Sequence, residues 1–143
     1  MKNILFILLF SISSYAQIKI DDVGDGWKAK VEQALVVIQT NDTEAFDMVK
    51  KHCKKISYLV STFSTTQNGD TVLITTNDMK AKSINNIAAI IVHESFHLKA
   101  LHDNYGLTEQ EEESKAYGVE LKFLQKLPNV ELWLIENAKN KRG

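Results

Sequence analysis

Hydrophobic side chains recur every three or four residues from Trp27 onward, which is the period of an amphipathic helix. The same period returns after a break at 41–43, where Asn, Asp and Thr can end one helix and cap the next. The apolar positions are Trp27, Val31, Leu35 and Ile38 in the first helix, and Ala45, Phe46, Val49 and Cys53 in the second. Two consecutive helices are therefore expected, with 17–26 as an exposed lead-in.

The pattern then changes to one typical of strands. The segments 56–63 (ISYLVSTF) and 71–76 (TVLITT) are rich in β-branched and aromatic residues. Asn68 and Gly69 lie between them as a turn signal. The two segments are therefore predicted to form a β-hairpin.

Three more helices are expected in the second half of the chain. Ser83 can cap a long helix that runs to about Leu101. The residues Thr-Glu-Gln-Glu at 108–111 form a capping-box pattern, which starts a helix that Pro128 ends. A last short helix is expected within 129–139. Two helices, a hairpin and three helices predict an α+β fold with a small sheet packed on a helical core.

The first 16 residues have the pattern of a secretory signal peptide. Lys2 supplies the positive charge, 4–12 form an apolar run too short to span a bilayer, and small residues precede the expected cut after Ala16. The remaining residues, 17–143, suffice for a single domain. We expect a secreted or periplasmic protein with no membrane span in its mature form.

Composition restricts the partners and the covalent bonds. The chain has 17 basic and 18 acidic residues and a formal net charge of -1, which gives no indication of a nucleic-acid partner. Cys53 is the only cysteine, so no disulfide can form within the chain. A buried, unreactive thiol is its expected state.

The helix expected at 83–101 carries three polar side chains within an apolar run. His93 and His97 lie on one helical face, roughly 6 Å apart, so that both imidazoles can bind one zinc ion. Glu94 can lean over the open side of the metal and take a proton from a bound water that attacks a carbonyl. The sequence is an HExxH motif, and a metal site explains it better than chance, because unpaired polar groups are costly to bury.

A catalytic zinc site needs a third protein ligand. Glu113 shares the inward face of the next helix with Tyr117 and Glu120, whereas Glu112 points more to the side. Two antiparallel helices joined by a short loop would bring Glu113 level with His97. Glu113 is therefore the expected third ligand, and Glu112 is the neighbouring alternative.

Asp103 is a second candidate for the third ligand. It lies ten residues after His93, the spacing of the metzincin pattern HExxHxxGxxH, which can end in Asp. However, Ala100 replaces the glycine at which the metzincin chain turns, and all three methionines precede the motif, so no Met-turn can follow. Asp103 is kept as the lesser alternative.

With HExxH on one helix and an ExxAY pattern from Glu113 on the next, residues 56–127 resemble gluzincin-type zinc metallopeptidases, in particular the very small members called minigluzincins. In that family two histidines and a later glutamate hold the zinc, and the motif glutamate is the general base. A small sheet lies above the metal, and its edge strand binds the peptide by main-chain hydrogen bonds.

The resemblance implies roles for residues of this chain. His93, His97 and Glu113 would hold Zn²⁺, Glu94 would be the base, and 71–76 would be the substrate-binding edge strand.

The family also supplies a Tyr or His that stabilises the oxyanion. His102, Tyr105 and Tyr117 are the candidates here. Tyr117 stands where many relatives have an aspartate that braces a histidine.

The expected function is therefore that of a secreted zinc-dependent endopeptidase that acts on peptide or protein substrates. One alternative is a secreted zincin-like binding protein that keeps the metal but does not cleave. Three protein ligands favour catalysis, because structural zinc sites normally have four. A helical adaptor with a fortuitous motif is a third possibility.

Overall fold

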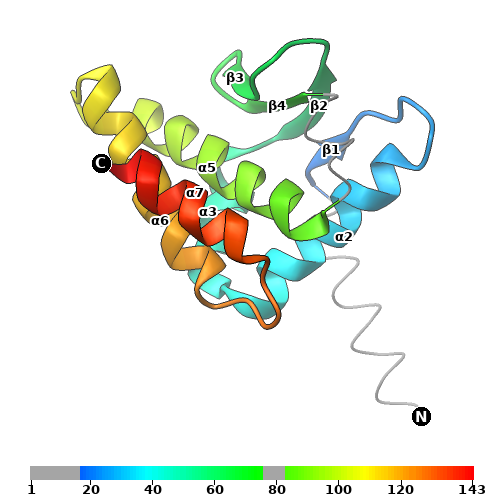
Figure 1. The fold of residues 1–143 in the computed structure, drawn as a ribbon. Helices are drawn as coiled ribbons and strands as arrows, with labels where there is room; N and C mark the ends of the chain where they lie inside the picture. The colour runs from blue at the N-terminus through cyan, green and yellow to red at the C-terminus, as the bar shows by residue number, and fades with distance from the viewer. Residues whose placement is uncertain (1–16, 76–82) are drawn as a thin grey trace.

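The computed structural model describes residues 17–75 and 83–143, which form five helices and a small four-stranded sheet (Figure 1). The elements are β1 (Lys19–Ile20), α2 (Trp27–Asn41), α3 (Thr43–His52), β2 (Lys55–Leu59), β3 (Thr65–Gln67), β4 (Thr71–Thr75), α5 (Ile84–His102), α6 (Glu109–Leu124) and α7 (Leu132–Arg142). The predicted α+β class is confirmed. The predicted signal peptide and its cleavage after Ala16 lie outside the described residues. None of the helices in the described ranges is long and apolar enough to cross a membrane.

The sheet differs from the predicted hairpin. Its strand order is β1-β2-β4-β3, and β2 pairs with β4 in parallel. The parts of the two predicted segments that form these strands, 56–59 and 71–75, are therefore neighbours but not a hairpin. The antiparallel partner of β4 is β3, which was not predicted. Asn68 and Gly69 do make a tight turn, with φ of 56° and 73°, but the strand that enters it is β3. A two-residue Asn-Gly turn joins only the strands directly beside it, and 56–63 ends too early to be one of them.

The position of β4 also corrects the expected edge strand. β4 lies between β2 and β3 and is buried at all five positions, so it is an inner strand. β3 is the edge on that side. At the other edge, β1 pairs with β2, and Ile18 beside it is buried. The expectation that 17–26 is exposed along its whole length is therefore wrong. The alternation of Ile18, Lys19 and Ile20 is the strand signal that explains this pairing.

α5 is the central helix of the fold. It packs against α2, α3, α6 and the β3–β4 hairpin, and α7 lies along α6 (Figure 1). Ile87, Ile91 and Leu98 of α5 are fully buried in the core. The helix that carries the HExxH motif is therefore held on several sides by packed apolar surface, which restricts its movement.

The predicted helix starts are confirmed by their caps. The hydroxyl of Ser83 accepts from the backbone N–H of Asn86 at the start of α5. Thr108 and Glu111 form a capping box at the start of α6, with both hydrogen bonds present. These caps satisfy backbone donors that have no partner within the helix, and so fix where α5 and α6 begin.

Cys53 is expected to be unreactive in the folded protein. It is fully buried, and burial raises the pKa of its thiol to about 12, so the reactive thiolate is scarce. An aromatic disulfide reagent at mildly alkaline pH should leave the native protein unmodified and should titrate one thiol per chain in denaturant. Prompt labelling of the native protein would show that this part of the core opens readily.

Candidate metal site

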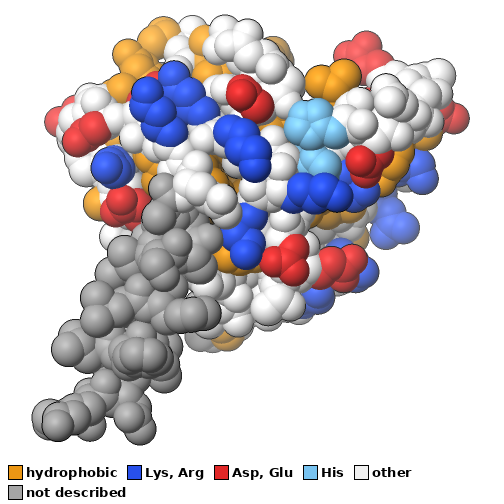
Figure 2. Space-filling model, turned by 180° about the vertical axis from the view of Figure 1, so that it is seen from behind, with side chains coloured by type: hydrophobic (Ala, Val, Ile, Leu, Met, Phe, Trp, Pro, Cys, Tyr) orange, Lys and Arg blue, Asp and Glu red, His pale blue; other side chains and the backbone are white. Residues whose placement is uncertain are grey.

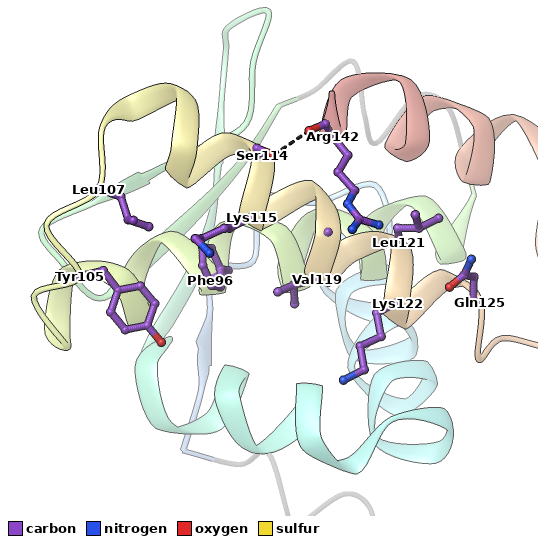
Figure 3. A pocket seen from close by; sticks show the side chains of 11 residues that line it. Phe96, Tyr105, Leu107, Ser114, Lys115, Val119, Leu121, Lys122, Gln125 and Arg142 are labelled. Atoms are coloured by element: carbon purple, nitrogen blue, oxygen red, sulfur yellow. Dashed lines mark hydrogen bonds between the residues drawn. The ribbon is translucent and has the colours of Figure 1, made fainter.

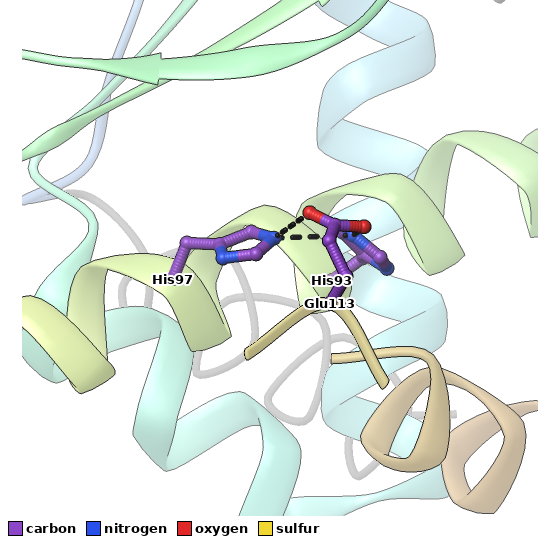
Figure 4. Close-up of side chains that lie close together, drawn as sticks. All are labelled: His93, His97 and Glu113. Carbon is purple, nitrogen blue, oxygen red and sulfur yellow. Dashed lines mark hydrogen bonds and ion pairs between the residues drawn. The ribbon is translucent and has the colours of Figure 1, made fainter. Parts of the chain in front are cut away.

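α6 folds back along α5 and brings three metal-ligating side chains to one place (Figure 4). Nε2 of His93 lies 3.3 Å from Nε2 of His97. Oε1 of Glu113 lies 2.9 Å from Nε2 of His97, and Oε2 of Glu113 lies 3.6 Å from Nε2 of His93. The expected His, His, Glu set is therefore brought together, with all three ligand atoms within 4.8 Å of one another.

These separations match the size of a zinc coordination shell. Two ligands bound at about 2.0–2.1 Å in a tetrahedral arrangement lie about 3.3–3.4 Å apart. The two imidazole nitrogens are at 3.3 Å, and the glutamate oxygens lie on either side of that value. The donor set of two imidazoles and one carboxylate is also one that catalytic zinc sites use.

Carboxylates on the far side of each imidazole fix its orientation. Nδ1 of His93 lies 2.9 Å from Glu120, and Nδ1 of His97 lies 2.6 Å from Glu112. When each Nδ1–H donates to its carboxylate, the Nε2 lone pair is left free and faces the shared centre. Glu112 thus contacts the outer side of His97, whereas Glu113 reaches the side where the two Nε2 atoms meet.

Burial and neighbouring charges act on the ionisation of this cluster. Burial lowers the pKa of His93, but the hydrogen bond and charge of Glu120, with Glu94 and Glu113 nearby, outweigh it and raise the pKa above its ordinary value. Burial also raises the pKa of Glu94, and the two histidines oppose that rise only in part. A carboxylate made more basic by burial is suited to accept a proton.

The cluster opens into a cleft of about 420 Å³ between β3 and the two helices. Glu94, His97 and Glu113 are among the residues that line it. The edge strand β3 and the residue before it form one wall, and Leu101 and two further glutamates of α6 complete the lining. These residues are Ser64, Thr65, Thr66, Leu101, Glu109 and Glu112. A ligand in this cleft would therefore contact Glu94 together with His97 and Glu113 of the candidate metal cluster.

A larger hollow, of about 960 Å³, lies on the other side of α6 (Figure 3). Its lining includes the aromatic rings of Phe96 and Tyr105 and three cationic side chains, Lys115, Lys122 and Arg142. It contains no histidine or carboxylate, so it lacks the groups that the predicted chemistry needs. The smaller cleft is the candidate site.

Asp103 lies away from the metal cluster. α5 continues through Ala100 to His102, so the chain does not turn where a metzincin chain would, and Asp103 falls at the end of the helix. Its carboxylate accepts a hydrogen bond from Lys99 at 2.7 Å.

Two of the three expected oxyanion stabilisers are also engaged elsewhere. The hydroxyl of Tyr105 bonds Lys99 at 2.5 Å, and His102 bonds His52 and the carbonyl of Gly69. Neither lines the cleft. Tyr117 packs its ring against the imidazole of His93, with centroids 4.4 Å apart, so it contacts a residue of the candidate metal cluster but does not line the cleft either.

The bracing roles of Glu112 and Glu120 were not predicted. Glu120 is a buried charged residue, and it lies two helical turns after Glu113 on the inward face. The spacing of seven residues from Glu113 was the sequence feature that could have indicated a second glutamate beside the histidines. The sequence pattern places it on the correct face but does not show which imidazole atom it meets.

Comparisons with protein-family models, with curated proteins and with solved structures found no match to this chain. The functional interpretation therefore rests on the chemistry and geometry of the site.

Proposed function

We propose that this protein is a secreted zinc-dependent endopeptidase, with zinc held by His93, His97 and Glu113. The observation that carries the proposal is the spacing of the three ligand atoms, all within 4.8 Å of one another beside an open cleft. Three protein ligands leave a coordination position for water or substrate, as catalytic zinc sites do. The secreted destination rests on the signal-peptide pattern of the first 16 residues.

Glu94 supplies the acid–base chemistry in this proposal. Zinc bound at the site would polarise the substrate carbonyl and make a bound water more acidic. Glu94 lines the same cleft and has no hydrogen-bond partner among the described residues, so its carboxylate is available to the attacking water. It accepts the proton as the water oxygen bonds to the carbonyl carbon, and it returns the proton to the amide nitrogen as the C–N bond breaks.

The edge strand β3 would hold the substrate in an extended conformation. Within 17–75 and 83–143, β3 pairs only with β4, so in this part of the chain no strand covers the other side of Thr65–Gln67, where a peptide could pair. A peptide added as a further strand would lie along the cleft wall, facing His97 and Glu113. The edge-strand role inferred for 71–76 thus belongs to β3.

The charge of the cleft favours substrates with basic side chains. Among the described residues, its lining contains four glutamates and neither lysine nor arginine. Glu109 is the one with no assigned role, and it is exposed. We expect Glu109→Gln to reduce kcat/KM for peptides that carry Lys or Arg near the scissile bond by about two- to fivefold, the effect of an exposed ion pair.

Glu111→Gln is the matched control for this prediction. It removes the same charge from the same helical turn, but Glu111 lies outside the cleft and Gln can keep the capping box. Its kcat/KM for basic peptides should be unchanged. Equal losses in both variants would mean that overall charge, and not the cleft, sets the preference.

A mixed peptide library tests the proposed activity. The purified protein should cleave peptides, lose this activity with a zinc chelator and regain it when zinc is added back. His102 and Tyr105 lie outside the cleft, so neither is placed to stabilise an oxyanion there. This observation favours one other function, that of a zinc-binding protein that does not cleave. Stoichiometric zinc with no cleavage of any library member would support that function and exclude the peptidase.

A further inference from the structure

Two histidines outside the metal site join three elements of the fold. His52 is the last residue of α3 and His102 the last of α5, and their Nδ1 atoms lie 2.7 Å apart. Nε2 of His102 lies 2.6 Å from the carbonyl oxygen of Gly69, in the turn between β3 and β4. On the face of the molecule in Figure 2, histidine side chains reach the surface among lysine and acidic side chains.

The hydrogen bond between His102 and Gly69 determines the direction of the hydrogen bond between the two histidines. The carbonyl of Gly69 can only accept, so Nε2 of His102 carries a hydrogen. In the neutral ring, Nδ1 of His102 is then an acceptor, and Nδ1–H of His52 must donate to it. The result is a polar chain that runs in one direction, from His52 through His102 to the turn.

The turn that receives this chain controls the wall of the cleft. A Cβ on Gly69 would lie only 3.5 Å from Leu101, so the turn sits close against α5. β3 is three residues long, and β4 is its only pairing partner in the part of the chain that the structure describes. Thr65 and Thr66 of this short strand line the cleft with His97 and Glu113, so a displaced turn would displace the wall.

We propose that His52 and His102 are positioning residues, which hold the β3–β4 turn against the end of α5 and thereby set the distance between β3 and the metal site. Their role in peptide binding rests on the proposed function, whereas the clamp itself is a property of the fold. Neither residue touches the substrate.

Acid should release this clamp. Two imidazoles that meet through their Nδ1 atoms share one proton, and a second proton leaves two donors facing each other. The charged side chains that act on His52 are Lys51 of α3, Lys99 of α5 and Asp103, the residue directly after α5. Burial, the charge of His102 and the two lysines lower the pKa of His52, and Asp103 only partly opposes them. One added proton can bind Nε2 of His52 and leave its Nδ1–H donor in place, so the clamp should hold at neutral pH. It should open only in acid that charges both rings, a state that the lowered pKa of His52 disfavours.

Hydrogen exchange with three variants tests the clamp. His102→Leu removes both hydrogen bonds and should speed amide exchange in residues 65–71 by roughly three- to tenfold, the range expected for one or two lost hydrogen bonds. His102→Gln should restore much of the protection, because its amide can donate to Gly69 and accept from His52. Tyr105→Phe, beyond the end of α5 and without a bond to the turn, is the control and should exchange as the wild type does.

Zinc content should be the same in all three variants, because the metal ligands are unchanged. In the peptidase assay, His102→Leu should raise KM by roughly the same factor with little change in kcat, because the wall that binds the peptide has moved and Glu94 has not. Wild-type protein should show the same faster exchange at acidic pH, after correction for the intrinsic rate. This wild-type measurement stands even if His102→Leu fails to fold.

If amide exchange in residues 65–71 is unchanged both in His102→Leu and in acid, the proposed clamp is wrong. A chain that cleaves no peptide at all would instead remove the proposed function and leave the exchange result to decide the clamp separately.

Discussion

Replacement of Glu94 by glutamine is expected to slow peptide hydrolysis by orders of magnitude and to leave zinc bound. Glu94 lines the cleft beside His97 and Glu113 but is not one of the three converging ligands. Glutamine keeps the shape of the side chain and cannot take the proton of the attacking water, so kcat should fall by about 10²- to 10⁴-fold. The measurements are kcat on the best peptide of the library and zinc per chain.

Ser95→Ala is the control for this change. Ser95 is the next residue of α5, is fully buried and has a hydroxyl without a hydrogen-bond partner among the described residues. Its loss should leave both kcat and zinc content near the wild-type values. Undiminished kcat in Glu94→Gln would exclude Glu94 as the base, whatever the state of the metal.

The second large effect is expected on metal affinity. Glu113→Ala removes one of the three proposed zinc ligands and should weaken zinc binding by more than the roughly 10- to 100-fold loss expected for an outer-shell partner. Glu112→Ala and Glu120→Gln remove the carboxylates that contact the Nδ1 atoms of His97 and His93, and their losses should fall within that smaller range. Competition with a chromophoric chelator gives all the dissociation constants on one scale.

This series also separates the two neighbouring glutamates. A greater loss of affinity in Glu112→Ala than in Glu113→Ala would exchange their roles, with Glu112 as ligand. Equal and small losses in both would mean that α6 does not supply a ligand at all.

The metal cluster could be predicted because it depends on helical geometry that the sequence shows directly. A spacing of four residues places His93 and His97 on one face of any α-helix. The capping box at Thr108 fixes the start of the next helix, and with it the register at which Glu113 meets His97. These are local rules, and tertiary packing did not override them.

The sheet could not be predicted in the same way. β-branched and aromatic composition indicates a strand but not its partner or its direction. The Asn-Gly turn specifies only the residues beside it, and the segment before it, β3, is short and polar. The parallel pairing of β2 with β4 is a contact between separate parts of the chain, and no local signal specifies it.

The surroundings of the histidines show the same limit. A helical pattern places Glu120 on the inward face of α6, but its contact with Nδ1 of His93 depends on how α6 is rotated against α5. His102 is close to the motif in sequence, and yet it bonds the turn between two strands. Proximity along the chain was therefore a poor guide to its partner.

X-ray absorption at the zinc edge, on the wild-type protein loaded with zinc, tests the central claim most directly. The predicted result is one zinc per chain with two imidazole nitrogens and two oxygens at about 2.0–2.2 Å, one oxygen from Glu113 and one from water. A shell closed by four protein ligands, a sulfur neighbour from Cys53, or no tightly bound zinc would contradict it.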